Sequence, residues 1–304
     1  MFLFSTLVAV GAAVSFALAA VFQQEAARSA DPEASLSPRL LLILLHRRKW
    51  LAGVGLLLCG YGLQALALSA GPVAVVQPIV ATELAFAIPI GIWRRRRRAG
   101  RREWAGIAAV LLGVSVLLWV ASPVKGTSQP SQLDWLLCLV PVGVAVAALV
   151  AASGRVRGPN RAVLLGSAAG LAFALLAVLT KAVTHNLGVD VASTFTNWEV
   201  YFLVGLGITA LVISQSAYQA GPLALSMPAI AIVEPTVAVL IGDTVFHEQA
   251  RLGGAALAVE LLAAAIAALG LLALATSPTV LSIYDQATGK PTGSSLGRRS
   301  RHLT

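Results

Sequence analysis

The sequence predicts an all-α membrane protein with about nine transmembrane helices, built as an inverted repeat of four, one and four helices. The chain is 58% hydrophobic and 12% charged, whereas soluble domains carry about 25% charged residues. Apolar runs of about 20 residues, the length of a helix that crosses a bilayer, recur along nearly the whole chain. Ten-residue segments of alternating polarity, which are typical of membrane β-barrels, are absent from the sequence.

The apolar runs define the expected elements in order. We predict spans at roughly 3–22, 49–69, 72–93, 103–122, 134–152, 162–184, 199–219, 222–242 and 252–276. The first span resembles a signal peptide, but no Lys or Arg precedes it, so we interpret it as a retained helix. These spans divide the chain into a first repeat (1–122), a linking helix within 123–161 and a second repeat (162–278). The residues 279–304 are rich in Gly, Ser, Thr and Arg and predict a disordered cytoplasmic tail.

The basic residues predict the orientation of the chain. Nineteen of the 22 Lys and Arg residues fall in the first, third and fifth connections and in the tail. The opposite face has only Lys125, Lys181 and Arg251. Basic connections stay in the cytoplasm, so we expect a multi-pass plasma-membrane protein with its N-terminus outside and its C-terminus inside. The net charge of +9 is thereby explained by orientation, and we expect no nucleic acid partner.

The two halves contain matching residues in the same order. These are Trp50 and Trp198, Ala70-Gly71-Pro72 and Ala220-Gly221-Pro222, Pro78 and Pro228, Glu83 and Glu234, Gly91 and Gly242, and Ser122-Pro123 and Ser277-Pro278. Because a single span separates the halves, the second half enters the membrane from the opposite side. Such an inverted repeat lets one fold open alternately to either face of the membrane.

Glu83 and Glu234 are the main candidates for the functional site. A carboxylate at the bilayer centre is costly, at roughly 2.5–3.5 kcal/mol on insertion scales. Prolines near both glutamates free backbone carbonyls in the same helices. Helices of this kind carry the substrate and coupling-ion sites of secondary transporters. We therefore interpret both residues as proton- or cation-exchanging groups; the alternative is that they join helices by hydrogen bonds.

Further polar residues extend the candidate site. Gln64 in one half, and Gln215 and Tyr218 in the other, can line a substrate path or form interhelical hydrogen bonds. Glu260 in the last span is another candidate, or pairs with Lys181. Gly166 and Gly170 form a small-xxx-small pair, which favours close helix packing.

Metal and enzymatic chemistry have weaker support in the sequence. Asp243, His247 and Glu248 could form a divalent-cation vestibule or a solvated loop, and we leave the metal open. The two cysteines have no metal-type spacing and predict no disulfide. No Walker loop, Rossmann glycine pattern, GxSxG or HExxH motif occurs, so we expect neither an enzyme nor a cofactor.

Several motifs resemble those of the drug/metabolite transporter superfamily. The segment 226–238, with Glu234-Pro235, followed by His247-Glu248, resembles the third helix and the following turn of an EamA-like half; His247 replaces the usual Gly. The segment 70–78 is similar to the nine-helix NIPA-type magnesium transporters of that superfamily. The resemblance implies exporter or cation-carrier activity.

From these observations we expect an alternating-access secondary transporter that moves a small metabolite or drug-like solute, in the direction of efflux. The alternatives are a NIPA-type carrier of magnesium or another divalent cation, and a non-transporting membrane scaffold or lipid-handling protein. The expected partners are the small-molecule or ion substrate and the lipid bilayer. A homodimer is compatible with the sequence.

Overall fold

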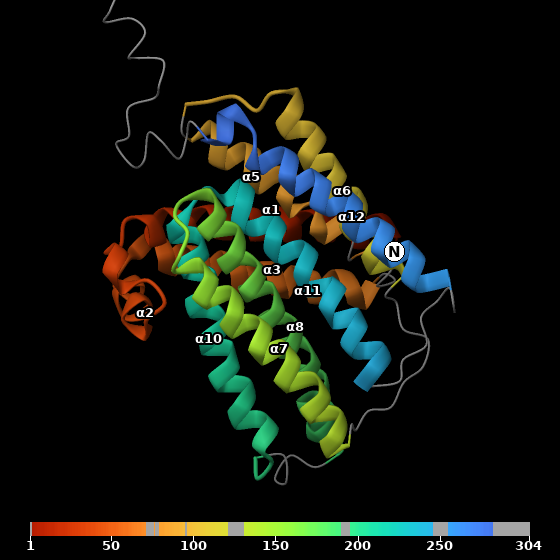
Figure 1. Cartoon of the computed structure of the whole chain (residues 1–304). Coiled ribbons are helices and arrows are strands. Elements are labelled where there is room, and N and C mark those ends of the chain that lie inside the picture. The colour runs from red at the N-terminus through yellow and green to blue at the C-terminus, as the bar shows by residue number, and fades with distance from the viewer. Residues whose placement is uncertain are drawn as a thin grey trace, which may run out of the picture.

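The computed structural model of the protein describes residues 2–70, 76, 79–94, 96–120, 131–189, 195–245 and 255–281. All regular secondary structure in this part of the chain is helical (Figure 1). The elements are, in chain order, α1 (Phe2–Arg28), the 3₁₀ turn η1 (Pro32–Ala34), α2 (Pro38–Leu45), α3 (Arg48–Ala70), α5 (Glu83–Trp93), α6 (Arg101–Val120), α7 (Gln132–Ser153), α8 (Pro159–Val189), α10 (Trp198–Ala220), α11 (Leu223–Val245) and α12 (Ala256–Ala275).

The described helices include six that are long and apolar enough to cross a membrane, namely α1, α3, α7, α8, α10 and α12. Two further apolar stretches are shorter, at Ile79–Trp93 and Leu223–Ala238. A described helix overlaps each predicted span, although the spans at 72–93, 103–122 and 252–276 are described only in part. The chain is therefore a multi-pass helical membrane protein.

The first connection differs from the prediction. Helix α1 continues to Arg28, beyond the predicted end of the first span, and the short helix α2 follows it. Ser37 precedes α2, and its hydroxyl accepts a hydrogen bond from the backbone N–H of Arg39 at 3.2 Å. Leu40 and Leu44 of α2 are fully buried. At about 1.5 Å per residue, this helix is about 12 Å long, which is too short to cross a bilayer.

Each half of the chain uses its first helix as a support for the next two. Helix α1 packs against α3 and α5, and α8 packs against α10 and α11. The approach of α8 to α11 depends on glycine: a Cβ on Gly166 would lie 2.8 Å from the carbonyl oxygen of Ser226, and one on Gly170 would lie 2.9 Å from Cβ of Val233. The prediction that Gly166 and Gly170 serve close helix packing is confirmed.

Helices α6 and α12 join the two halves in an antiparallel pair. A Cβ on Gly106 would lie 2.9 Å from the carbonyl oxygen of Gly270, and a Cβ on Gly113 would lie 2.7 Å from Cβ of Ala267. The later residue of α6 thus meets the earlier residue of α12, so the helices run in opposite directions. A buried core that combines side chains of α1, α5, α6, α11 and α12 lies beside this pair.

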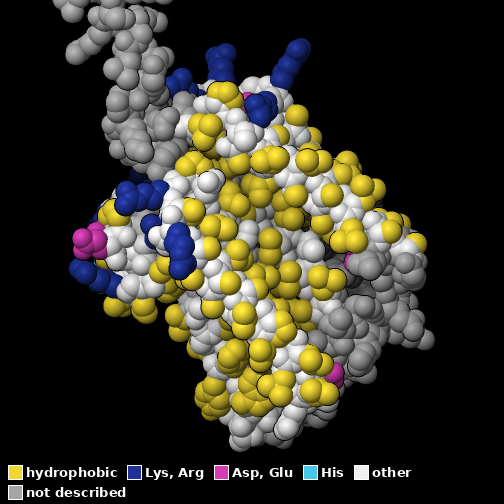
Figure 2. Space-filling view, in the orientation of Figure 1, with side chains coloured by type: hydrophobic (Ala, Val, Ile, Leu, Met, Phe, Trp, Pro, Cys, Tyr) yellow, Lys and Arg dark blue, Asp and Glu magenta, His cyan; other side chains and the backbone are white. Residues whose placement is uncertain are grey.

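The Lys and Arg side chains that the structure describes gather at one end of the helix bundle, which we call the basic end. Hydrogen bonds connect its segments: Arg94 to Glu25, Arg102 to Thr276, Arg161 to Ser35, and Gln219 to the carbonyl of Asp31. Figure 2 shows Lys and Arg side chains at the top and left of the molecule, whereas hydrophobic side chains cover much of the remaining visible face. The first, third, fifth and seventh connections and the residues after α12 therefore meet on the same side.

Candidate functional site

Glu83 and Glu234 lie on two helices that contact each other. Glu83 is the first residue of α5, Glu234 lies near the middle of α11, and α5 packs against α11. Along its helix, Glu83 is ten residues from Trp93 at the basic end, and Glu234 is eleven residues from Leu223. These separations correspond to about 15 and 17 Å, close to half of the roughly 30 Å hydrocarbon thickness. Both carboxylates therefore lie about half a membrane thickness along their helices from the basic end.

The two carboxylates and two tyrosine hydroxyls form one electrostatic cluster. Glu83 and Glu234 lie within electrostatic range of each other, and Tyr218 of α10 and Tyr61 of α3 lie within range of both. Glu83, Glu234 and Tyr218 are partly exposed, and Tyr61 is 58% exposed. The structure thus brings three predicted site residues together from both halves. The sequence analysis did not identify Tyr61. A single tyrosine in an apolar helix gives no pattern that distinguishes a site residue from a residue that faces lipid.

The backbone changes its hydrogen bonding immediately before Glu83. Residues 79–81 are helical, but Thr82 interrupts the helix. The N–H of Thr82 bonds the carbonyl of Ile79 at 3.0 Å, and the N–H of Ala85 bonds the carbonyl of Thr82 at 2.8 Å. These bonds span three residues, as in a 3₁₀ turn, and such turns inside a helix often mark hinges. Glu83 therefore occupies the first turn of α5, where the helix dipole favours a negative charge.

Glu234 has a more regular setting. Helix α11 continues through it from Leu223 to Val245. A Cβ on Gly170 of α8 would lie 3.2 Å from the backbone nitrogen of Glu234 and 3.1 Å from the carbonyl oxygen of Ile230. The glycine therefore lets the backbone of α8 approach the backbone that carries the carboxylate. The turn of α11 from Ile230 to Glu234 therefore lies directly against α8.

Gln215 takes part in a buried hydrogen-bond chain between helices. Its side chain is 1% exposed. Its Oε1 accepts a hydrogen bond from Nε1 of Trp50 at 3.1 Å, and its Nε2 donates to Oε1 of Gln23 at 2.9 Å. The amide thus links α10 to α1 and α3 across the two halves. This geometry favours the interhelical alternative for Gln215 over contact with a substrate.

The remaining candidates have less defined surroundings. Gln64 of α3 is partly buried, Glu260 of α12 is 8% exposed, and each interacts with other groups in the protein. The side chains of Asp243 and Lys181, and the residues His247 and Glu248, lie outside the described parts, so the cation vestibule stays a prediction. Within the described residues there is no group of three or more His, Cys, Asp or Glu side chains that could hold a metal ion.

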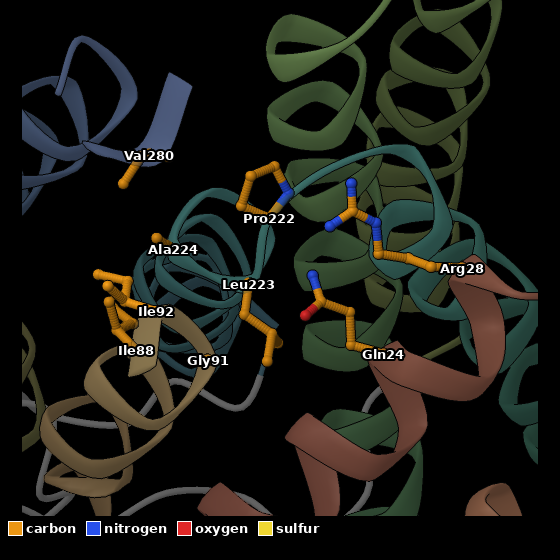
Figure 3. A pocket seen from close by; sticks show the side chains of 9 residues that line it. All are labelled: Gln24, Arg28, Ile88, Gly91, Ile92, Pro222, Leu223, Ala224 and Val280. Carbon is orange, nitrogen blue, oxygen red and sulfur yellow. The ribbon is translucent and has the colours of Figure 1, made fainter. Parts of the chain in front are cut away.

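Helices α5 and α11, which carry the two glutamates, pack closely against each other at the basic end. A cavity of about 20 Å³ remains between α1, α5 and α11, lined among others by Ile88, Ile92 and Leu223 (Figure 3). This volume holds about one water molecule. Leu223 and Ile92 are 2% and 3% exposed. The contact between α5 and α11 therefore leaves no wide passage here through the described residues.

A short segment after α12 completes this closure. Residues 278–281 form a helical turn, and the fully buried side chain of Val280 faces the cavity from the side opposite α1 (Figure 3). The hydroxyl of Ser277 donates to Oε1 of Glu103 in α6, and the N–H of Gly100 donates to Oε2 of Glu103 at 2.6 Å. Residues 279–281, assigned to the tail from the sequence, are thus part of the packed structure. We call residues 277–281 the terminal latch.

Comparison with known proteins gives two matches. The profile of the EamA-like transporter family matches residues 3–119. The chain is 31% identical over 251 residues to an uncharacterized protein of Corynebacterium glutamicum, and the match covers 81% of this chain and 86% of that protein. No solved structure matches the chain significantly.

Proposed function

Because the chain belongs to the EamA-like transporter family, we propose that this membrane transporter is an alternating-access secondary carrier that moves a small metabolite or drug-like solute out of the cell. The observation that carries the proposal is the cluster of Glu83, Glu234, Tyr61 and Tyr218. Residues from four helices and both halves of the chain interact electrostatically there, and the two carboxylates have mid-bilayer depth.

The packing of the helices supports an inverted repeat of four, one and four helices. In both halves the first helix contacts the second and the third. The two fourth helices, α6 and α12, form an antiparallel pair, as expected when the second copy is inserted upside down. The two third helices, α5 and α11, contact each other beside the cluster. Carriers of this architecture place their substrate sites between the repeats.

The carboxylates supply the chemistry of coupling. Two negative charges close together at mid-membrane favour the uptake of a proton or a cation, because either one reduces their mutual repulsion and the cost of burying charge. The hydroxyls of Tyr61 and Tyr218 can donate hydrogen bonds to the same groups or to a solute. We assign Gln64 and Glu260 to the path that leads to this cluster, and Gln215 to its support.

With the proposed orientation in the membrane, the structure corresponds to a state in which the central site is closed to the cytoplasm. The basic end collects the connections that contain most of the Lys and Arg residues, so we place it, with the C-terminus, on the cytoplasmic side of the plasma membrane and the N-terminus outside. In this orientation the closed contact of α5 with α11 and the terminal latch form the inner gate. Opening inward then requires the two third helices to separate.

Transport assays with purified protein in liposomes test the proposal. The vesicles contain a pH-sensitive dye, and a library of small metabolites and drug-like amines is added one compound at a time. We expect at least one compound to drive proton movement, and Glu83→Gln and Glu234→Gln each to abolish it. Glu33→Gln is the matched control, because Glu33 is exposed in the first connection, and it should retain full activity.

The same vesicles separate the alternatives. Magnesium chloride in place of the organic compounds, with a magnesium-sensitive dye, tests the divalent-cation carrier. A signal with magnesium alone, lost in both glutamine variants, would replace the organic cargo by a metal ion. If no compound and no ion moves, the carrier interpretation fails in favour of a scaffold. If both glutamine variants transport as well as the wild type, the coupling role of Glu83 and Glu234 is wrong.

A further inference from the structure

The turn that follows α5 forms an arginine-lined hollow at the basic end. Its volume is about 560 Å³, and it is lined by Trp93, Arg94, Arg96, Arg97 and Arg98. All five side chains are exposed.

A helix cap with an unusual residue shapes this hollow. The N–H of Arg97 bonds the carbonyl of Ile92 at 3.3 Å, and the N–H of Arg96 bonds the carbonyl of Trp93 at 2.7 Å. This is the hydrogen-bond pattern of a Schellman cap, in which the left-handed residue is usually glycine. Here that residue is Arg96, with φ of 57°, a conformation that is unfavourable for a residue with a Cβ. Strained positions of this kind cluster at ligand-binding sites.

The charges around the hollow are only partly balanced. Arg94 pairs with Glu25 and lies over the ring of Phe22 at 5.6 Å, so its position is fixed by the protein. Among the described residues, no ion pair joins Arg96, Arg97 or Arg98 to a carboxylate. Three guanidinium groups on one turn are therefore available for an external anion. Guanidinium groups bind phosphate oxygens through paired hydrogen bonds.

The place of the hollow indicates where this anion comes from. Trp93 is 72% exposed at the end of an apolar helix, and tryptophan in such a position lies at the membrane–water interface. The arginines follow Trp93 directly, so they lie at the level of the lipid headgroups. Clusters of basic residues next to a membrane helix attract anionic lipids.

We propose that Trp93, Arg96, Arg97 and Arg98 form a binding site for the phosphodiester headgroup of an anionic phospholipid, with Arg94 as its fixed edge. The indole of Trp93 lies beside the upper acyl chain and glycerol, and the three guanidinium groups bind the phosphate. Because the site caps α5, the bound lipid holds the cytoplasmic end of the helix that carries Glu83. Lipid binding itself does not depend on the cargo of the transporter.

Native mass spectrometry of the full-length protein in detergent tests this site. Phosphatidylglycerol and phosphatidylcholine are added separately, and bound lipid is counted. Replacing Arg96, Arg97 and Arg98 together by Gln should weaken phosphatidylglycerol binding at least about tenfold, because the three guanidinium groups that bind the phosphate are removed. The control replaces Arg39, Arg155 and Arg157, which are exposed at the same end, and removes the same charge. An equal loss in both triple variants would overturn the proposal.

A single substitution separates binding from folding. Arg96→Gly should leave the protein as stable as the wild type or more stable, because glycine suits the left-handed cap, and it should still weaken phosphatidylglycerol binding. Unchanged binding in this variant would count against a role for Arg96. A competition experiment with sodium phosphate at millimolar concentration separates the lipid from free phosphate. If phosphate displaces phosphatidylglycerol completely, the site binds free phosphate and the lipid assignment is wrong.

Discussion

In the second half of the chain, α11 passes through Glu234 without interruption, and Gly170 of α8 lies against its backbone. In the first half, Thr82 separates a helical turn from α5, and Glu83 is the first residue after this break. The two carboxylates nevertheless have nearly the same depth from the basic end. The two halves thus keep the position of the charge but differ in how firmly the backbone holds it. We infer that the second half is the stiffer support and that motion around the site begins in the first half.

The largest expected effect comes from breaking the contact that both halves share. In Gly113→Leu the new side chain meets the backbone nitrogen of Ala267, which lies 2.9 Å from the position of a Cβ. We expect a loss of stability of about 3 kcal/mol, since neither helix can move aside without disturbing its own half. Thermal unfolding in detergent measures the effect. Gly143→Leu is the control, because a Cβ there meets no atom within 4 Å; comparable losses in both variants would show that α6 and α12 do not pack as described.

A smaller loss of stability is expected when only the contact between α8 and α11 in the second half is disturbed. Gly170→Leu places a branched side chain against the carbonyl of Ile230 and the nitrogen of Glu234, and should cost about 2 kcal/mol. It should also reduce transport, because α11 is pushed away from α8 where it carries the carboxylate. Gly205→Leu in α10 has open space around it and should change neither property. Normal transport by the Gly170 variant would contradict the proposed stiffness of this half.

The hydrogen bonds of Gln215, which link the two halves, should contribute less to the free energy of unfolding. Gln215→Leu keeps the size of the side chain but leaves Nε1 of Trp50 and Oε1 of Gln23 without their partner. Buried hydrogen bonds in membrane proteins contribute about 0.6 kcal/mol on average, so we expect a loss of about 1 kcal/mol in unfolding experiments. Thr209→Val is a suitable comparison, because the Thr209 hydroxyl bonds only a carbonyl of its own helix and is exposed.

Hydrogen exchange compares the two glutamate segments without any mutation. Residues 79–85 should exchange about tenfold faster than residues 230–236, because the irregular turn at Thr82 opens more easily than the continuous helix. Mass spectrometry of peptides from the protein in detergent provides the measurement. Equal protection of both segments would remove the proposed difference between the halves.

The helices were predictable from the sequence because each depends on its own composition. Apolar runs mark the membrane helices, and the spacing of Gly166 and Gly170 indicates a close contact within one helix face. The repeated positions of Glu83 and Glu234 singled out the two main candidates. The EamA-like resemblance was confirmed by the match at residues 3–119, whereas features of the magnesium transporters were not.

The remaining parts of the site depend on distant residues that meet only after folding. Gln215 meets Trp50, 165 residues away in the chain, and no local pattern indicates this partner. Tyr61 joins the cluster because α3 lies beside α1, and its residue type alone does not separate it from a lipid-facing tyrosine. Val280 lies two residues after Pro278 at the start of a polar region, so its burial was not apparent from composition. Helix α2 was missed because an apolar run of eight residues is too short for a span.

The terminal latch sets a practical boundary for handling the protein. A chain that is shortened no further than residue 281 keeps every C-terminal residue that the structure describes. A deletion that removes Ser277 and Val280 would instead take away a partner of Glu103 and uncover apolar surface between α5 and α11. Any shortened version for crystallisation or cryo-electron microscopy should therefore end after the latch and not at the last transmembrane helix.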